Sequence, residues 1–140
     1  MGSEMKRIPY PMTVSANDNE RVLVNDYYCK LSNHRMLEVK KGFKYNGASI
    51  PRIFWSLIGS PFTGAYQRAA FIHDVLYAGE IFTRKECDEI FILIMKEHGC
   101  NWVTRNVIWS AVRICGGLVW NSHTKEKIEY NRQFIYLRKV

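Results

Sequence analysis

The chain has 140 residues, of which 47% are hydrophobic and 24% are charged, and its formal net charge at pH 7 is +7. This length and apolar content exclude an intrinsically disordered chain and favour one compact domain, while the charge favours an anionic partner or merely aids solubility. The apolar runs fall short of the roughly 18 residues that a membrane-spanning helix needs, and we find no secretory signal.

In chain order the pattern predicts an extended arm, an antiparallel β-hairpin, a helical core and a C-terminal tail, over residues 1–20, 21–45, 46–120 and 121–140. The arm holds Pro9 and Pro11 beside a polar stretch, a composition that suits neither a helix nor a central strand. Strand-like runs at 21–31 and 35–45 flank a polar turn, so we expect them to pair. The expected fold class is therefore α+β, with a small N-terminal antiparallel sheet followed by three or four helices in a single domain.

A tight turn at Asn46–Gly47 precedes helices that we predict over residues 51–58, 65–78, 84–98 and 102–118. Ser49 can cap the first of these helices, and Gly79 is expected to end the second. Thr83 and Glu86 form a T-x-x-E capping box at the start of the third helix. The short connection between the second and third helices predicts that they pack antiparallel.

The fourth predicted helix is capped by Asn101 and repeats apolar residues at helical spacing, which predicts that one of its faces lies in the core. That face consists of Val107, Ile108, Ala111, Ile114, Cys115 and Leu118. We also expect Trp102, Trp109 and Trp120 in the core rather than in an interface. The tail is charged first and apolar-aromatic last, so it either adds an edge strand or contacts a partner.

His73 and Asp74 stand together in the apolar run AAFIHDVLY. Burying a charge is costly unless it is paired or holds a metal, so the two residues are either a satisfied structural node or a catalytic group. His73 and Tyr77 lie one turn apart on the same face of the predicted helix. Asp88 lies on the next helix, and antiparallel packing of the two helices can bring it opposite His73.

A contact between His73 and Asp88 would allow His73 to act as a general base. Asp88 would fix the tautomer of His73, and the second ring nitrogen would take a proton from water. Asp74 would remain as an oxygen ligand for Ca²⁺, with backbone carbonyl groups of a glycine-bearing loop completing the metal shell. Further candidate residues of the site are Asn46, Ser49, Arg52, Arg84 and Arg113. Taken alone, the arginines indicate surface or ion-pair positions.

The segments HDVLY and TRKECDEIF resemble the signature of the phospholipase A2 superfamily, in which one helix carries H-D-x-x-Y and the next carries an Asp with an aromatic residue three positions later. The aromatic position corresponds to Phe91. The resemblance implies that His73 is the general base and Asp88 its partner. It also implies that Tyr77 is a supporting hydrogen-bond donor and Asp74 a calcium ligand.

Other elements of a phospholipase A2 are replaced in this chain. The cysteines that precede the HD motif correspond to Ala69 and Ala70, which suits a reducing compartment or a virion interior. The calcium loop would fall within 46–64, and its carbonyl groups would lie near the scattered glycines Gly47, Gly59 or Gly64. No C-x-x-C pair is present, which argues against a zinc ribbon and favours reduced, buried thiols at Cys29, Cys87, Cys100 and Cys115.

Four motifs resemble, in their order, the phage- and prophage-encoded family of unknown function numbered 1353. They are GFKYNGASIPR, AAFIHDVLY, RKECDEIF and AVRICGG, and the resemblance covers roughly residues 38–120. The resemblance implies a phage or prophage origin, and so a location in the virion or in the host bacterial cytoplasm. Asn46 stands where we expect an Asp in the family pattern, which weakens any metal or acid role for this position.

Three functions remain open at this point. The first is a virion, tail or accessory component that is built on a phospholipase A2-like scaffold and contacts other virion proteins. The second is a calcium-dependent ester hydrolase that acts on a phospholipid at an anionic membrane, or on a peptidoglycan surface. The third is an inhibitor that binds a host protein. We find no motif for sequence-specific nucleic-acid binding, and the histidines lack the spacing of a zinc peptidase.

Overall fold

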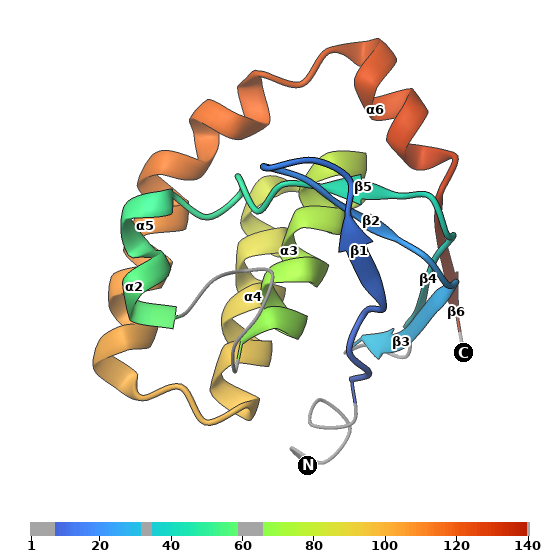
Figure 1. Ribbon diagram of the computed structural model, residues 1–140. Coiled ribbons are helices and arrows are strands. Elements are labelled where there is room, and N and C mark those ends of the chain that lie inside the picture. Colours follow the sequence, from blue (N-terminus) through green and yellow to red (C-terminus); the bar gives the residue numbers. More distant parts are fainter. Residues whose placement is uncertain (1–7, 32–34, 59–65, 140) are drawn as a thin grey trace.

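The strands form two antiparallel sheets of three strands each (Figure 1). The computed structural model describes residues 8–31, 35–58 and 66–139. The first sheet has the order β1 (Thr13–Ser15), β2 (Arg21–Leu23) and β5 (Lys44–Tyr45). The second has the order β3 (Tyr27–Leu31), β4 (Arg35–Val39) and β6 (Ile135–Lys139). The predicted α+β class, an N-terminal antiparallel sheet followed by helices, is confirmed.

Each of the two long predicted strands is divided between the sheets. The run 21–31 becomes β2 and β3, and the run 35–45 becomes β4 and β5. The chain turns at Gly42, which has a φ of 97°. Asp26 stabilises this turn, because its carboxylate accepts a hydrogen bond from the Lys41 backbone N–H at 2.9 Å. Strands that bend at such a corner can line two sides of one core.

The predicted extended arm packs on its own domain in its described part, residues 8–20. Its segment Thr13–Ser15 is strand β1, and Ile8 is buried. The Tyr27 hydroxyl donates to the carbonyl oxygen of Pro9 at 2.8 Å, and Arg68 donates to that of Ile8 at 3.1 Å. These contacts attach the described part of the arm to its own domain.

The four predicted helices are present with small changes at their ends, and a further helix forms within the predicted tail. They are the 3₁₀ turn η1 (Arg52–Phe54), α2 (Trp55–Ile58), α3 (Gln67–Gly79), α4 (Arg84–Glu97), α5 (Trp102–Asn121) and α6 (Lys125–Arg132). Figure 1 shows α3 and α4 between the sheets and α5. On the sheet side, the ring of Phe71 packs edge-on against Tyr27 and Tyr45, each with centroids 5.0 Å apart.

Two of the predicted caps are confirmed and two are wrong. The Thr83–Glu86 capping box is present, and the Asn101 side chain accepts from the Thr104 N–H at 2.8 Å. Gly79 does not end its helix in the left-handed conformation; Glu80 does so, with a φ of 45°. A Cβ at Gly79 would lie 2.9 Å from the side chains of Ile81 and Ile135, so close packing explains this glycine. Ser49 caps no helix, because its hydroxyl is engaged elsewhere.

The apolar face predicted for the fourth helix is only partly buried. Ile108 and Ala111 lie in the core, but Val107, Ile114 and Leu118 are 38%, 79% and 80% exposed. Trp102 is 69% exposed, which corrects its predicted burial, whereas Trp109 and Trp120 are partly buried. The helix is apolar on both sides, and α4 packs against only one of them. Periodicity therefore identified the helix and could not tell which side faces inward.

The C-terminal tail forms helix α6 and strand β6. β6 pairs antiparallel with β4 at the edge of the second sheet, which is one of the two predicted alternatives.

The four cysteines are free thiols; three are buried and Cys115 is partly buried. Within the part of the chain that the structure describes, no helix combines the length and the apolar character that crossing a membrane requires.

Candidate functional site

Helices α3 and α4 bring His73 and Asp88 into direct contact. His73 Nε2 lies 2.7 Å from Asp88 Oδ1, and both side chains are 0% exposed. The His73 ring is enclosed by the rings of Tyr77 and Phe91, with centroids 4.3 and 4.5 Å away. The antiparallel helix pair predicted from the short connection therefore places imidazole and carboxylate face to face, inside the core.

Asp88, on α4, receives hydrogen bonds from two other helices, α3 and α5. The Tyr77 hydroxyl on α3 donates to Oδ1 at 2.7 Å, and Arg113 Nη1 on α5 donates to Oδ2 at 2.7 Å. Arg84 Nη1 lies 3.7 Å from Oδ2 and also donates to carbonyl oxygens of α5. Burial alone raises the pKa of Asp88, but the hydrogen bonds from His73, Tyr77 and Arg113 hold it below its ordinary value. Asp88 is therefore an ionised acceptor that joins three helices.

The second nitrogen of His73 faces a serine rather than water. His73 Nδ1 lies 2.9 Å from Ser49 Oγ, and the same hydroxyl donates to Asp74 Oδ1. A continuous buried chain of hydrogen bonds therefore runs from Asp88 through His73 and Ser49 to Asp74. The sequence analysis predicts Ser49 as a helix cap and as a further candidate residue of the site, without a contact to His73. Its contact with His73 spans 24 residues, and no local pattern reports a contact of that range.

Asp74 is held by donors of the loop that follows β5. The Gly47 N–H donates to Oδ2 at 2.7 Å, and the Ser49 N–H donates to Oδ1 at 3.3 Å. A φ of 74° at Gly47, which favours glycine, lets the loop turn its N–H groups toward the carboxylate. Burial raises the pKa of Asp74, although the hydrogen bonds from Ser49 and Gly47 oppose the rise.

This arrangement does not fit a calcium ion at Asp74. Calcium requires oxygen ligands, whereas Gly47 and Ser49 direct N–H and O–H donors at the carboxylate. Both carboxylate oxygens are occupied by those donors. Gly59 and Gly64, two of the glycines named for a calcium loop, lie outside the described residues. Among the residues that are described, no group of three or more His, Cys, Asp or Glu side chains is placed to hold a metal.

The remaining candidate residues lie apart from this buried chain of hydrogen bonds. The Arg52 guanidinium stacks over the Trp55 ring, 4.9 Å from its centroid, on the surface. The exposed Asn46 side chain accepts a hydrogen bond from the Ala48 N–H at 2.9 Å, which stabilises the loop. Asn46 therefore shapes the loop that holds Asp74.

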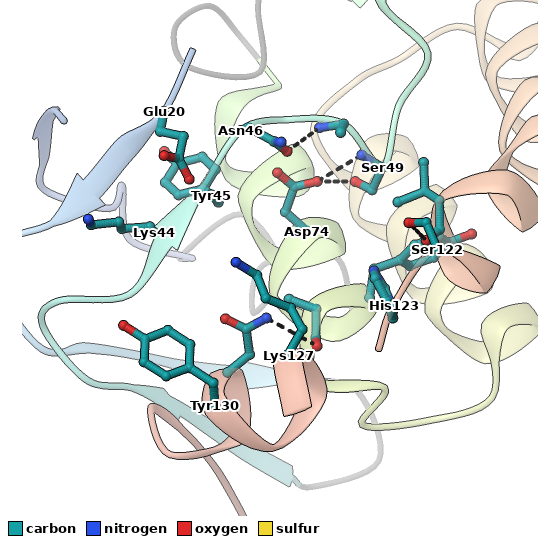
Figure 2. A pocket seen from close by; sticks show the side chains of 15 residues that line it. Glu20, Lys44, Tyr45, Asn46, Ser49, Asp74, Ser122, His123, Lys127 and Tyr130 are labelled. Carbon is teal, nitrogen blue, oxygen red and sulfur yellow. Dashed lines mark hydrogen bonds between the residues drawn. The ribbon is translucent and has the colours of Figure 1, made fainter. Parts of the chain in front are cut away.

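A cavity of about 560 Å³ borders the buried residues. Ser49 and Asp74 line one side of it, and residues of the α5–α6 connection and of α6 line the other (Figure 2). Its full lining is Glu20, Lys44, Tyr45, Asn46, Ala48, Ser49, Asp74, Tyr77, Ala78, Val119, Ser122, His123, Lys127, Tyr130 and Asn131. His73 and Asp88 do not belong to this lining, so the cavity ends at Ser49 and Asp74.

A family model described as "Protein of unknown function (DUF1353)" matches residues 21–112. The matched region contains Ser49, His73, Asp74 and Asp88. The "Uncharacterized protein y4jT" of Sinorhizobium fredii (strain NBRC 101917 / NGR234) is 35% identical over 88 residues, which are 62% of this chain and 26% of that protein. The chain thus aligns with about a quarter of the length of this relative. No solved structure matches the chain.

Proposed function

The chain belongs to the DUF1353 family of proteins of unknown function, and from this starting point we propose that it is a non-catalytic component of a protein assembly, such as a phage virion or tail. In this role His73 and Asp88 hold the helices together and do not act on a substrate. The helix pair then resembles phospholipase A2 in its fold alone, because a shared fold does not imply a shared activity.

The observation that carries the proposal is the α5 outer face, formed by Val103, Val107, Ile114 and Leu118. These residues follow one another at spacings of four, seven and four, so they line one side of the helix. Ile114 and Leu118 are 79% and 80% exposed, although aliphatic side chains gain free energy when they leave water. A contiguous apolar surface of this kind is typical of a protein interface.

The burial of the candidate catalytic residues supports a structural role for them. His73 and Asp88 are 0% exposed, and each ring nitrogen of His73 has a protein partner. A general base must reach the proton that it removes, directly or through one water molecule. In this conformation Ser49 and Tyr77 stand between His73 and the cavity.

Charging the α5 outer face tests the proposal. In particles of the phage that encodes the protein, the wild type is expected to copurify with virion proteins. The double variant Ile114→Glu and Leu118→Glu is expected to be incorporated about tenfold less, because a buried unpaired carboxylate costs at least 1.4 kcal/mol. Val14→Glu, at a half-exposed apolar position on β1, is the matched control and should be incorporated normally.

Three results would count against this function. The first is absence of the wild type from purified particles, and the second is normal incorporation of the double variant. The third is recovery of a host protein, instead of virion proteins, with the wild type and not with the double variant. That third result would support the alternative of a host inhibitor that uses the same face. Thermal unfolding of each variant verifies that the exposed substitutions leave the fold intact.

A metal-independent hydrolase is the second candidate, and the hydrogen bonds that connect Ser49, His73 and Asp88 favour it. Ser49 Oγ is within 2.9 Å of His73 Nδ1, and His73 Nε2 is within 2.7 Å of Asp88, which are distances suited to a nucleophile, a base and an orienting acid. Ser49 also borders the cavity. To attack an ester, however, its hydroxyl must release Asp74 and give its proton to His73.

Turnover of phospholipid and of activated esters, measured with a chelator present, separates the two candidates. The favoured function predicts no released product from the wild type and no labelling of Ser49 by a fluorophosphonate. Turnover that persists in Ser122→Ala but disappears in Ser49→Ala would instead establish the hydrolase. Ser122 is the matched control, because it also lines the cavity while its hydroxyl donates to the Val119 carbonyl at 2.6 Å, its one bond within the described residues.

A further inference from the structure

The cavity of about 560 Å³ beside α6, here named the α6 pocket, has the size of a small-molecule site. Its walls come from β5, the loop after β5, the end of α3, the α5–α6 connection and α6. Figure 2 shows Asp74 and Ser49 on one side and Lys127 projecting from α6 into the cavity. Segments far apart in the sequence therefore converge on one hollow.

The acidic groups of the α6 pocket already have protein donors. Asp74 accepts hydrogen bonds from the Gly47 and Ser49 backbone, and Glu20 accepts one from the Asn17 amide at 2.9 Å. His123 on the far wall pairs through Nδ1 with Glu80 at 3.1 Å. These donors fix the positions of the Asp74 and Glu20 carboxylates but do not cancel a carboxylate charge.

The two ammonium groups of the pocket differ from the acids. Lys44 on β5 and Lys127 on α6 both line the cavity and are exposed. Neither side chain makes a hydrogen bond or an ion pair with any of the residues that the structure describes. Each ammonium group carries three donors and a full charge. Because neither ammonium group has a partner among the described residues, both are available to an anionic ligand.

We infer that the α6 pocket binds a phosphate monoester, with Lys44 and Lys127 on the phosphate group. A phosphate monoester carries a charge of roughly −1.5 to −2 at pH 7, which matches the two lysines better than a single carboxylate does. Lysine recognises phosphate as a point charge and needs no fixed fork geometry. The chain's net charge of +7 adds a long-range attraction for such an anion.

The rest of the pocket suits the organic part of such a ligand. Tyr45, Ala78 and Val119 offer apolar contact, and Ser122 and Asn131 offer polar groups for ligand hydroxyls. A mixed lining of this kind is typical of sites for small polar metabolites or lipid headgroups. The inference is independent of the proposed assembly role, because a phosphate site can serve an assembly component as well as an enzyme.

Titration of the full chain by isothermal calorimetry and amide NMR tests the inference. The probes are inorganic phosphate, glycerol 3-phosphate, glycerol as the uncharged control, and vesicles with and without phosphatidic acid. Glycerol 3-phosphate is expected to bind, to shift amide signals around Lys44 and Lys127, and to bind at least about tenfold more weakly to Lys127→Gln. Lys125→Gln is the matched control, because Lys125 is exposed on the same helix but does not line the pocket.

The probes also distinguish the source of the phosphate. Binding of glycerol 3-phosphate alone supports a soluble ligand, and binding of phosphatidic acid vesicles that depends on Lys127 supports a lipid headgroup. Equal weakening in Lys125→Gln and Lys127→Gln would show attraction by overall charge and would overturn the inference. So would the lack of any response to all phosphate probes. The double variant Ile114→Glu and Leu118→Glu changes no residue of the α6 pocket and should leave this binding intact, so failure here and failure of the assembly role are separate results.

Discussion

Replacing Asp88 by alanine is expected to lower the free energy of unfolding by about 3–5 kcal/mol, which corresponds to a fall in Tm of about 10 °C or more. The substitution leaves Arg113, His73 and Tyr77 without the carboxylate that accepts from each of them at 2.7 Å. Because Asp88 and His73 are 0% exposed, water cannot replace the lost acceptor without entering the core. Urea and thermal unfolding of the purified chain measure the effect.

Glu89→Ala is the matched control for this prediction. Glu89 is the next residue on α4 and is solvent-exposed, and its side chain makes a long surface ion pair with Lys85 at 3.8 Å as its one interaction in the described part of the chain. Its removal should change stability by less than about 0.5 kcal/mol. Similar small effects at both positions would show that the buried hydrogen bonds do not hold the helices together.

Gly116→Ala and Gly117→Ala are expected to change stability in opposite directions. A Cβ at Gly116 would lie 2.5 Å from the Tyr77 hydroxyl and 3.2 Å from Arg84 Nη1. Tyr77 would then have to move away from Asp88, so we expect a loss of about 2 kcal/mol despite the better helix propensity of alanine. At Gly117 the nearest atom, Arg84 Cζ, would lie 3.9 Å away, which is ordinary contact. There the gain in helix propensity should stabilise by about 0.5–1 kcal/mol.

Chemical denaturation of the two glycine variants, side by side with the wild type, measures this contrast. Tyr77→Phe combined with Gly116→Ala identifies its cause. If the hydroxyl is the obstacle, removing it should recover part of the lost stability, since the nearest clash disappears with it. Equal effects of the two glycine substitutions would mean that α5 approaches α3 less closely than the structure has it.

Local signals predicted the helices and the fold class well. The Thr83–Glu86 capping box and the Asn101 cap are side-chain contacts within three residues, so they could be derived from the sequence. The contact of His73 with Asp88 followed from a short connection between two helices, which leaves antiparallel packing as the simplest arrangement. For the tail, the sequence left open an edge strand or a contact with a partner, and β6 forms the edge strand.

The errors concern contacts between distant segments. Ser49 suits a helix cap locally, but its hydroxyl is bound by Asp74 and His73, 25 and 24 residues away. The residues Ile114 and Leu118 have the right spacing for a core face, yet α4 covers the other side of the helix. Gly79 was expected as a helix stop, whereas the packing of Ile81 and Ile135 requires it. In each case a tertiary contact overrode a local preference.

A double-mutant cycle between His73 and Asp88 tests most directly whether their hydrogen bond holds α3 against α4. The free energy of unfolding is measured for His73→Ala, Asp88→Ala, the double variant and the wild type. A coupling of at least about 1.5 kcal/mol is predicted, because residues that share a buried hydrogen bond are not additive. Additivity within about 0.5 kcal/mol would contradict a structural role for the pair.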